Sequence, residues 1–386
     1  MKNDMKIIFI TESLVLLGGT EKILTEKANY LAEHFGIDVT IITCTQPNHQ
    51  QNAFPLYKTI KQINLCIPYY RQYKYGYPKR LWIKRETDHE IQKALTKVIL
   101  QLKPDIIIGT AGFRADIICA IDCKAKIIIE CHEARYFIKA DLDRQRSVFT
   151  RLYVNLYKRR NYLQTIEKKA DVVVTLTEGD KLLWKRARHV EVIPNFSTMQ
   201  VSNYSNYKNK RIIAVGRLSP EKGYERLIEV WKQVSPQYPD WILDIYGEGK
   251  LREELIATIQ NSKLKNINIH QATHHISDEY AKSSICVMTS HLEGFGLALL
   301  EAMRHGIPCV AFDCPFGPRS IIKDSICGYL VEDGNIKQFA DKLGFLMESE
   351  ETRKVFSAAA IERAKDFSVE LVMHRWKLLF EKLVEQ

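Results

Sequence analysis

The chain has 386 residues, of which 46% are hydrophobic and 26% charged, the composition of a soluble globular protein. Because a single core rarely serves more than about 250–300 residues, two domains are expected. No apolar run approaches the roughly 18–20 residues of a membrane span, and the first residues lack the pattern of a signal peptide. The nine cysteines form no CxxC pair, which argues against a zinc site or a disulfide framework and favours the reducing cytoplasm.

The net charge of +10 is unevenly distributed along the chain. Residues 1–190 carry 32 Lys and Arg against 20 Asp and Glu, a net charge of +12. Residues 191–386 carry 24 against 26, a net charge of −2. This imbalance indicates that the first half faces an anionic partner, which could be nucleic acid, an acidic substrate or an anionic membrane surface.

The first half is predicted to alternate strands and helices, since short β-branched runs are each followed by an amphipathic stretch. Its predicted strands are 6–11, 38–44, 104–109, 125–130 and 171–176, and its first helix is 20–35. The second half repeats the pattern, with predicted strands at 211–215, 241–246, 266–270, 285–289, 308–312 and 327–331. Apolar strands that alternate with helices form parallel sheets, so we expect an α/β protein with two Rossmann-like domains.

The boundary between the domains is expected at 196–210, because this Ser- and Asn-rich segment has no helical period and is typical of a linker. The first domain is then 1–195 and the second is 211–368. A last helix is predicted at about 369–386, with apolar residues at helical spacing and Trp376 among them. This helix is expected to cross back and dock on the first domain.

Two glycine-bounded loops of the second domain carry unusual chemistry. Gly216 and Arg217 directly follow the strand 211–215, and Lys222 comes five residues later. Arg offers a fork of donors and Lys a point charge, so together they could clamp a diphosphate. Gly247, after the next strand, would let a ligand or a facing strand approach the backbone. Taken singly, these features are also typical of surface charge and tight turns.

The strongest motif follows the strand 285–289, where Glu293-Gly294-Phe295-Gly296-Leu297 leads into a helix that carries Glu301. The start of a helix presents N–H donors and a partial positive charge, which suit an anion. Glu301, about one turn inside, could accept hydrogen bonds from the vicinal hydroxyls of a ribose. All of these loops are expected at the carboxyl edge of one sheet, where ligands bind in open α/β folds.

These residues resemble retaining glycosyltransferase family 4, whose fold is GT-B, with two Rossmann-like domains that face a central cleft. The resemblance is carried by the Glu-x7-Glu pair Glu293 and Glu301 within EGFGLALLEAMRHGIPCVAF, by GRLSPEKG at 216–223 and by YGEG at 246–249. It covers the second domain well and the first more loosely, through Gly18-Gly19-Thr20-Glu21.

The resemblance implies that the second domain holds a nucleotide-sugar donor. By analogy, Arg217 and Lys222 would hold the diphosphate and stabilise the leaving nucleotide. Glu301 would bind the ribose, and Glu293 would meet the donor sugar. The donor-binding residues expected in this way are Gly18, Gly19, Gly216, Gly247, Gly294, Phe295, Gly296, Leu297 and Glu301.

Two features of the first domain extend the resemblance. The loop Gly18-Gly19 would close over the diphosphate, and His132, which follows an apolar strand, matches the family's active-site histidine near the transferred sugar. The resemblance implies a retaining, metal-independent reaction without a cofactor, in which two cations and a helix start take the place of Mg²⁺. The residues expected to act in catalysis are His132, Arg217, Lys222 and Glu293.

The segment 312–318 resembles the DCPxGP element of bacterial family members that add galactose, glucose or N-acetylhexosamines to polysaccharides or lipid-linked glycans. Those relatives often have Glu before the paired isoleucines that follow, where this chain has Ser320. We therefore expect transfer of a hexose or N-acetylhexosamine from a UDP-sugar to a glycan or undecaprenyl-linked glycan in cell-surface polysaccharide synthesis. Two alternatives stay open: a GT-B-fold UDP-sugar epimerase, which needs no second substrate, and a non-catalytic nucleotide-sugar-binding subunit.

Basic and aromatic residues are interleaved in two segments of the first domain. The segment 69–85 holds six cations, six aromatic residues and no acid, and 144–160 holds a second cluster. Such segments suit an anionic bilayer, so a cytoplasmic protein in peripheral contact with the inner face of the cell membrane is expected. A solvated loop and a core-packed helix could have the same composition. Nucleic acid is not expected as a partner, because no recognition motif accompanies the charge.

Overall fold

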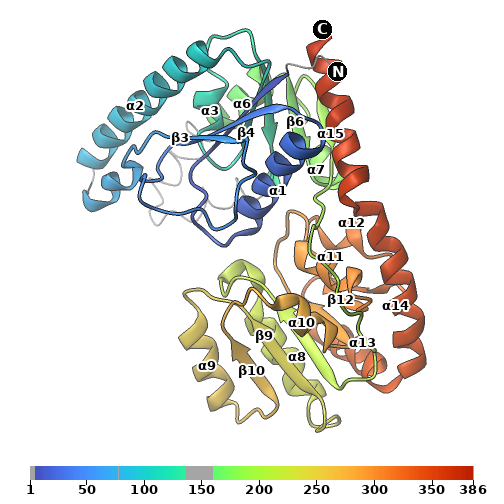
Figure 1. The fold of residues 1–386 in the computed structure, drawn as a ribbon. Coiled ribbons are helices and arrows are strands. Elements are labelled where there is room, and N and C mark those ends of the chain that lie inside the picture. Colours follow the sequence, from blue (N-terminus) through green and yellow to red (C-terminus); the bar gives the residue numbers. More distant parts are fainter. Residues whose placement is uncertain (1–4, 77, 136–159, 386) are drawn as a thin grey trace. The chain divides into compact units, whose positions relative to one another are not determined.

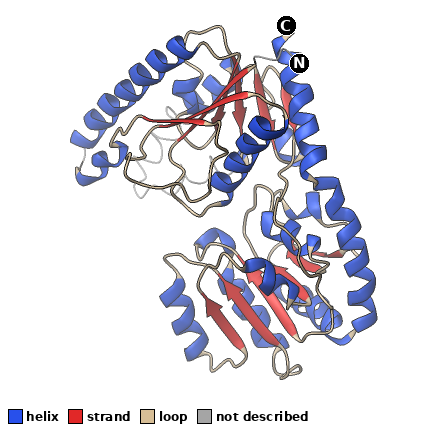
Figure 2. Ribbon diagram, in the orientation of Figure 1, coloured by secondary structure: helices blue, strands red, loops and turns tan. Residues whose placement is uncertain are grey.

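The computed structural model describes residues 5–76, 78–135 and 160–385 (Figure 1). The chain divides into two compact units. Unit 1 consists of Met1–Ile193 together with Val372–Gln386, and unit 2 consists of Pro194–Leu371. In each unit the strands lie side by side in one layer, and helices pack against that layer (Figure 2). Both units therefore have the α/β architecture that the sequence predicts.

The sheet of unit 1, within the described residues, has seven parallel strands in the order β3-β2-β1-β4-β5-β6-β7. These strands are β1 (Lys6–Thr11), β2 (Asp38–Thr43), β3 (Lys61–Asn64), β4 (Ile106–Thr110), β5 (Lys126–Glu130), β6 (Val172–Thr175) and β7 (Val190–Val192). The helices are α1 (Gly19–His34), η1 (Tyr69–Lys74), α2 (Lys79–Leu102), α3 (Ala115–Ile118), α6 (Arg160–Lys169), α7 (Glu178–Lys181) and α15 (Val369–Val384). Helix α15 begins in unit 2 and belongs to unit 1 from Val372 onward.

Unit 2 has a six-stranded parallel sheet in the order β10-β9-β8-β11-β12-β13. Its strands are β8 (Arg211–Val215), β9 (Ile242–Tyr246), β10 (Ile267–His270), β11 (Ile285–Met288), β12 (Cys309–Phe312) and β13 (Gly328–Val331). Its helices are η3 (Pro220–Lys222), α8 (Tyr224–Val234), α9 (Arg252–Asn261), α10 (Ile276–Ala281), α11 (Leu297–Arg304), α12 (Pro318–Ile321), α13 (Ile336–Glu348), α14 (Glu350–Ala364) and η4 (Lys365–Phe367).

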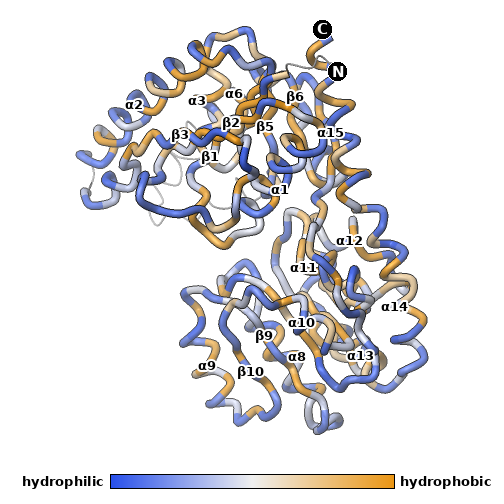
Figure 3. The backbone as a smooth tube through the Cα atoms, viewed as in Figure 1, coloured by the Kyte–Doolittle hydropathy of each residue, from blue (hydrophilic) through white to orange (hydrophobic). Residues whose placement is uncertain are grey.

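The central strands are largely apolar, because helices shield them from water (Figure 3). In unit 1, every residue of β4 is buried, and in unit 2 the same is true of β11 and β12. Helix α8 covers its sheet with a stripe at helical spacing, in which Leu227, Ile228 and Trp231 are almost fully buried. Burial of a large apolar side chain contributes roughly 1.5–3 kcal/mol, so these stripes fix each helix on its sheet.

The strand order reverses once in each sheet. In unit 1 the chain winds outward from β1 to β3 and then returns to place β4 beside β1. In unit 2 it does the same with β8 and β11. The loops that leave the two neighbouring strands at such a reversal diverge and open a crevice, which is where open α/β sheets bind ligands. In unit 2, these loops are the two that carry the predicted Arg217/Lys222 and Glu293–Leu297 motifs.

Two strands were absent from the sequence prediction. Strands β3 (KQIN) and β7 (VEV) lie at the two edges of the unit 1 sheet, and their residues are only partly buried. An edge strand packs against one neighbour, so it needs no continuous apolar run and leaves a weak signal in the sequence.

The segment 196–210, expected as a linker, packs as part of unit 2. Phe196 is fully buried, and the Ser205 hydroxyl donates to the Ser283 carbonyl at 2.5 Å. The Arg353 guanidinium, from α14, donates to the Tyr207 carbonyl at 2.7 Å. The segment is therefore ordered without periodic secondary structure, through hydrogen bonds to residues far along the chain in unit 2.

Candidate active site

Two loops at the strand-order reversal of unit 2 are joined by hydrogen bonds. The loop that leaves β8 ends at Gly223, whose carbonyl accepts a hydrogen bond from the Thr289 hydroxyl at 2.9 Å. The His291 N–H, on the loop that leaves β11, donates to the Glu221 carbonyl at 2.9 Å. Gly223 has a φ of 63°, and a Cβ there would overlap the Thr289 carbonyl, so only glycine allows this approach. The two predicted motifs therefore form one surface.

A charge cluster joins the same two loops. The Lys222 ammonium lies 2.6 Å from Oε1 of Glu293, and the Ser290 hydroxyl donates to the same oxygen at 2.7 Å. The Glu293 side chain is only 7% exposed, whereas that of Lys222 is 26% exposed. The carboxylate is thus fixed from two sides, and it holds the ammonium at the surface of the site. Sequence reasoning placed Lys222 and Glu293 here but did not identify Ser290.

Arg217 lies on the same loop as Lys222 and is exposed. Partial burial alone would raise the pKa of Glu221, but the Ser219 hydroxyl and the charges of Arg217 and Lys222 outweigh it and lower the pKa. The loop therefore carries a positive potential around a carboxylate that stays ionised. Two cations on one loop match the charge of a diphosphate.

Gly216 and Gly247 hold the loops after β8 and β9 against each other. The Gly216 N–H donates to the Tyr246 carbonyl at 3.0 Å, and the Leu218 N–H donates to the Glu248 carbonyl at 2.8 Å. A Cβ on Gly247 would overlap the Gly216 carbonyl. Of the two roles predicted for Gly247, the structure favours the approach of a facing chain segment, which supports the loop that carries the cations.

Helix α11 starts directly beside the charge cluster. Gly296 precedes it with a φ of 99°, a conformation that glycine adopts without strain, and Leu297 is its first residue. The first N–H groups of a helix have no acceptor within the helix and carry its positive dipole end, so this start can bind an anion. Phe295, by contrast, is buried and packs edge-on against Phe367 with ring centroids 5.6 Å apart, so its side chain has a structural role.

Glu301 lies in the second turn of α11 and is 7% exposed. Burial first, and the Glu301 carboxylate second, raise the pKa of the Tyr280 hydroxyl, which lies on α10. The Glu301 carbonyl accepts from the imidazole of His305 at 2.8 Å, which anchors this turn of the helix. Glu301 is therefore a nearly buried carboxylate one turn behind the helix start.

The segment 313–318 braces the backbone of Glu293. The Glu293 N–H donates to the Pro315 carbonyl at 3.1 Å. The Glu293 carbonyl accepts from the N–H groups of Phe316 at 2.9 Å and Gly317 at 3.1 Å. The Asp313 carboxylate holds the Arg319 guanidinium by two contacts of 2.8 and 2.7 Å. This Pro- and Gly-rich element therefore fixes the loop that presents the charge cluster.

In unit 1, Gly18 and Gly19 form the start of helix α1. Gly18 is the N-terminal flanking residue, and its carbonyl accepts from the Lys22 N–H at 3.0 Å. A Cβ on Gly18 would collide with the Glu21 carboxylate, whereas the space around Gly19 is open. The loop before them exposes Leu16 and Leu17 to solvent. The expected glycine loop is therefore an exposed helix start at the strand-order reversal of the unit 1 sheet.

His132 lies two residues beyond β5, also in unit 1. Its side chain is 6% exposed, and its Nε2 lies 3.4 Å from Oε2 of Glu130, the last residue of the strand. Within the described residues, neither ring nitrogen has a hydrogen-bond partner of good geometry. The other oxygen of Glu130 pairs with the buried ammonium of Lys27. Sequence reasoning found the histidine but missed Glu130 and Lys27.

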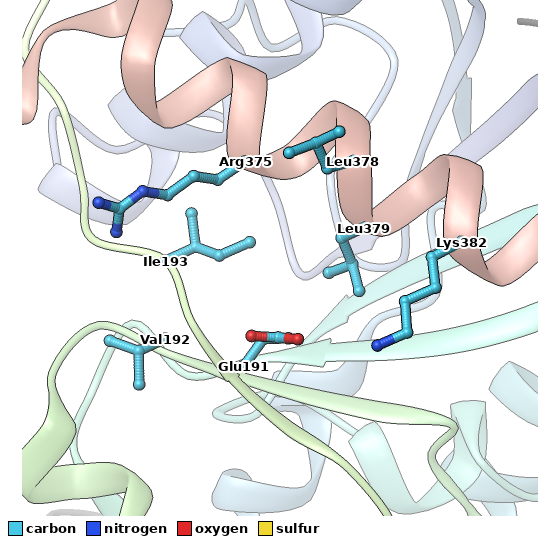
Figure 4. Close-up of a pocket in the computed structure, with 7 residues that line it drawn as sticks. All are labelled: Glu191, Val192, Ile193, Arg375, Leu378, Leu379 and Lys382. Carbon is cyan, nitrogen blue, oxygen red and sulfur yellow. The ribbon is translucent and has the colours of Figure 1, made fainter.

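A pocket of about 330 Å³ lies elsewhere in unit 1, between strand β7 and helix α15 (Figure 4). Its apolar floor is flanked by one acidic and two basic side chains. The lining residues are Glu191, Val192, Ile193, Arg375, Leu378, Leu379 and Lys382. None of the residues that the sequence analysis assigns to the active site lines this pocket, so it is a feature of the seam where the C-terminal helix meets an edge strand.

Two family models match the chain one after the other. The model described as Glycosyltransferase Family 4 matches residues 17–197, and the model described as Glycosyl transferases group 1 matches residues 196–363. The first begins at the glycine loop of unit 1 and contains His132. The second contains the whole charge cluster of unit 2.

Several relatives of the chain are named glycosyltransferases. An uncharacterized glycosyltransferase of Haemophilus influenzae is 28% identical over 379 residues, which are 96% of this chain and 99% of the relative. The amylovoran biosynthesis glycosyltransferase AmsD of Erwinia amylovora is 36% identical over 218 residues. That match covers 54% of this chain and 61% of AmsD, so it spans less than two thirds of that relative.

Solved structures share the fold. A mutant of S. aureus TarM in complex with Fondaparinux, alpha-GlcNAc-glycerol and UDP superposes with a TM-score of 0.76 at 17% identity, over 97% of this chain and 99% of TarM. The pneumococcal O-GlcNAc transferase GtfA in complex with UDP and GlcNAc gives 0.76 at 15% identity, over 99% of this chain and all of GtfA. The chain therefore belongs to the glycosyltransferases of the GT-B fold, with a family 4 domain followed by a group 1 domain.

Proposed function

We propose that this glycosyltransferase moves a hexose or N-acetylhexosamine from a UDP-sugar to a hydroxyl of a glycan or lipid-linked glycan in cell-surface polysaccharide synthesis. The observation that carries the proposal is the joining of Arg217, Lys222 and Glu293 to the start of α11 in one surface of unit 2. Cations and a helix start suit a diphosphate, and a carboxylate beside them suits sugar hydroxyls. UDP is present in the TarM and GtfA complexes, and AmsD serves amylovoran biosynthesis, which supports the choice of donor and of acceptor class.

The reaction is proposed to need no metal ion. When the bond between the sugar and the diphosphate breaks, negative charge grows on the leaving phosphate. Arg217, Lys222 and the N–H groups at the start of α11 would stabilise that charge in place of Mg²⁺. Preorganised donors of this kind supply about 3–4 kcal/mol each in other enzymes.

Retention of the anomeric configuration is proposed to follow from attack on the face that the nucleotide leaves. The bond between the anomeric carbon and the phosphate oxygen breaks, and the acceptor oxygen forms its bond to the same carbon from the same side. The proton of the acceptor hydroxyl passes to the departing phosphate oxygen. In this scheme Glu293 positions the donor sugar in unit 2, and the family resemblance gives Gly18, Gly19 and His132 of unit 1 their proposed active-site roles.

Peripheral contact of the cytoplasmic protein with an anionic membrane is proposed through 69–85, the η1–α2 corner. Tyr70, Tyr73 and Trp82 are more than half exposed there, and Lys79 stacks over Tyr75 at 4.4 Å. Interleaved rings and cations are typical of an interfacial surface, at about 1 kcal/mol per near-surface cation.

The structure reduces the number of cations in 69–85 that could reach lipid. Arg71 pairs with Glu86 at 3.2 Å, and Lys84 pairs with Asp88 at 2.6 Å. The second expected basic segment, 144–160, lies outside the described residues except for Arg160, where α6 begins. No helix among the residues in the described ranges combines the length and the apolarity that crossing a bilayer requires.

The experiment that tests the proposal incubates the purified chain with radiolabelled UDP-sugars, with and without a glycan acceptor. The expected result is an acceptor-dependent product that keeps the anomeric configuration of the donor. Conversion of the UDP-sugar to an epimer without acceptor would assign the chain to the epimerases instead. Binding of UDP-sugars with no conversion under any condition would identify it as a binding subunit.

A further inference from the structure

Helix α1 buries a lysine in the middle of its apolar stripe. Its buried residues Ile23, Leu24, Ala28 and Leu31 follow helical spacing, and Lys27 lies among them with 1% of its side chain exposed. An unpaired ammonium at such a position would be very costly, so its partners explain why it is there. Those partners come from two other elements of unit 1.

The first partner is Glu130, at the end of β5, which is 2% exposed and ion-paired with Lys27. The second is Trp376 of helix α15, whose ring centroid lies 4.0 Å from the Lys27 ammonium. An ammonium over an indole face is stabilised by the ring quadrupole, most strongly where water is excluded. Lys27 is thus enclosed by a carboxylate and an aromatic ring.

Glu130 uses its other oxygen toward His132. Its Oε2 lies 3.4 Å from Nε2 of the imidazole, and the His132 side chain is only 6% exposed. Glu130 is the charged group paired with the imidazole, and Lys27 pairs with the opposite oxygen of the same carboxylate. The guanidinium of Arg135, three residues further on, pairs with the Glu167 carboxylate at 2.9 Å. The backbone N–H of Arg135 donates to the Asp180 carboxylate at 2.7 Å.

We infer that Lys27 and Glu130 are positioning residues for His132, so that the imidazole is held through a chain of contacts that runs from Trp376 through Lys27 and Glu130. This inference rests on the proposed function, because it gives His132 its role. Enzymes commonly use a buried carboxylate to fix the orientation and tautomer of a histidine. Here the carboxylate itself is fixed by a lysine that the terminal helix encloses. The last helix thereby contributes to the geometry of a residue some 240 positions earlier in the sequence.

Two single variants with opposite electrostatic effects on His132 test the inference. Lys27→Met removes the cation and leaves Glu130 to stabilise the imidazolium, so the midpoint of the His132 titration, followed by its ring NMR resonances, should move to higher pH. Glu130→Gln removes the anion, so the midpoint should move to lower pH. His132→Gln identifies the resonance. Lys377→Met, which removes a cation over the Phe35 ring elsewhere on α15, is the matched control and should leave the midpoint in place.

Each single variant leaves one buried charge unpaired and could fail to fold. The neutral double variant Lys27→Met/Glu130→Gln leaves no unpaired buried charge, so its core should stay folded. We expect it to lower kcat at least tenfold while the KM for the UDP-sugar changes less than twofold. Equal midpoints in all variants, together with wild-type kcat in the folded double variant, would overturn the inference. The NMR titration needs no turnover, so a chain that transfers no sugar would refute the proposed function while the titration still decides the positioning role.

Discussion

The Lys222 ammonium and the Glu293 carboxylate lie 2.6 Å apart and join the two loops at the strand-order reversal of unit 2. The contact links residues 71 positions apart in the sequence, and each residue follows a different strand of the sheet. A diphosphate bound at the start of α11 would share the ammonium with this carboxylate. The pair therefore keeps a cation oriented in the site before the substrate arrives, which is the basis of electrostatic preorganisation.

Replacing Lys222 by Met should lower kcat/KM for sugar transfer by about 100- to 1,000-fold, because one charge-stabilising donor is lost from the transition state. Steady-state kinetics with a radiolabelled UDP-sugar measure the effect, and thermal unfolding checks that the variant is folded. Lys232→Met serves as control, since Lys232 pairs with Glu229 on the surface of α8. Similar kinetics in the two folded variants would remove Lys222 from the catalytic site.

Gly223→Ala should destabilise unit 2 far more than Gly334→Ala. Both glycines have positive φ, 63° and 84°, so alanine costs roughly 1–2 kcal/mol at either position. At Gly223 the new Cβ would also overlap the Thr289 carbonyl, whereas nothing lies near a Cβ at Gly334. Urea unfolding of the two variants measures the difference. Equal losses would show that the two loops can separate at little cost.

Acid should weaken unit 1 through Glu130. Burial alone would raise its pKa, but Lys27 and His132 outweigh burial and lower the pKa from 4.5 to about 2. A carboxyl with a lowered pKa stabilises the folded state above its unfolded value, and this contribution is lost as the pH falls from about 4.5 towards 2. Unfolding free energies measured across that range should fall in the wild type. The fall should be smaller in Lys27→Met/Glu130→Gln, and identical slopes in both proteins would argue against the ion pair.

Chelation of divalent metals should leave sugar transfer unchanged within about twofold, because Arg217, Lys222 and the start of α11 are proposed to carry the diphosphate charge. The measurement compares initial rates after EDTA treatment with rates in added Mg²⁺ or Mn²⁺. A loss of activity that Mg²⁺ restores would mean that Arg217, Lys222 and the start of α11 cannot stabilise the diphosphate charge without a metal ion.

The parts of the fold that the sequence predicted are those in which one local pattern decides the structure. The central strands are continuous apolar runs, and α15 has its apolar residues at helical spacing, so their positions agree with the prediction to within two residues. The edge strands β3 and β7 were not predicted, because a partly buried strand needs no continuous apolar run. The packing of the segment 196–210 in unit 2 was not predicted, because its order comes from hydrogen bonds to residues far along the chain, such as Ser283 and Arg353.

The candidate site was predictable where glycines and charges cluster within one loop. Ser290 and Glu130 could not be found in this way, because their importance comes from contacts with residues on other elements. Lys27 did leave a signal: it interrupts the apolar stripe of α1 at a position that helical spacing places inside the core. A lysine at such a position predicts a buried acid elsewhere in the chain, although the sequence alone does not identify which one.

Calorimetric titration with UDP in the presence of EDTA tests the donor site most directly. The wild-type chain should bind UDP, and Glu301→Gln should bind it about 10- to 100-fold more weakly, because hydrogen bonds to a charged group contribute roughly 1.5–3 kcal/mol. Glu350→Gln, at the exposed start of α14, should bind like the wild type. Equal affinity in all three proteins, or no UDP binding by the wild type, would contradict the assignment of this site in unit 2.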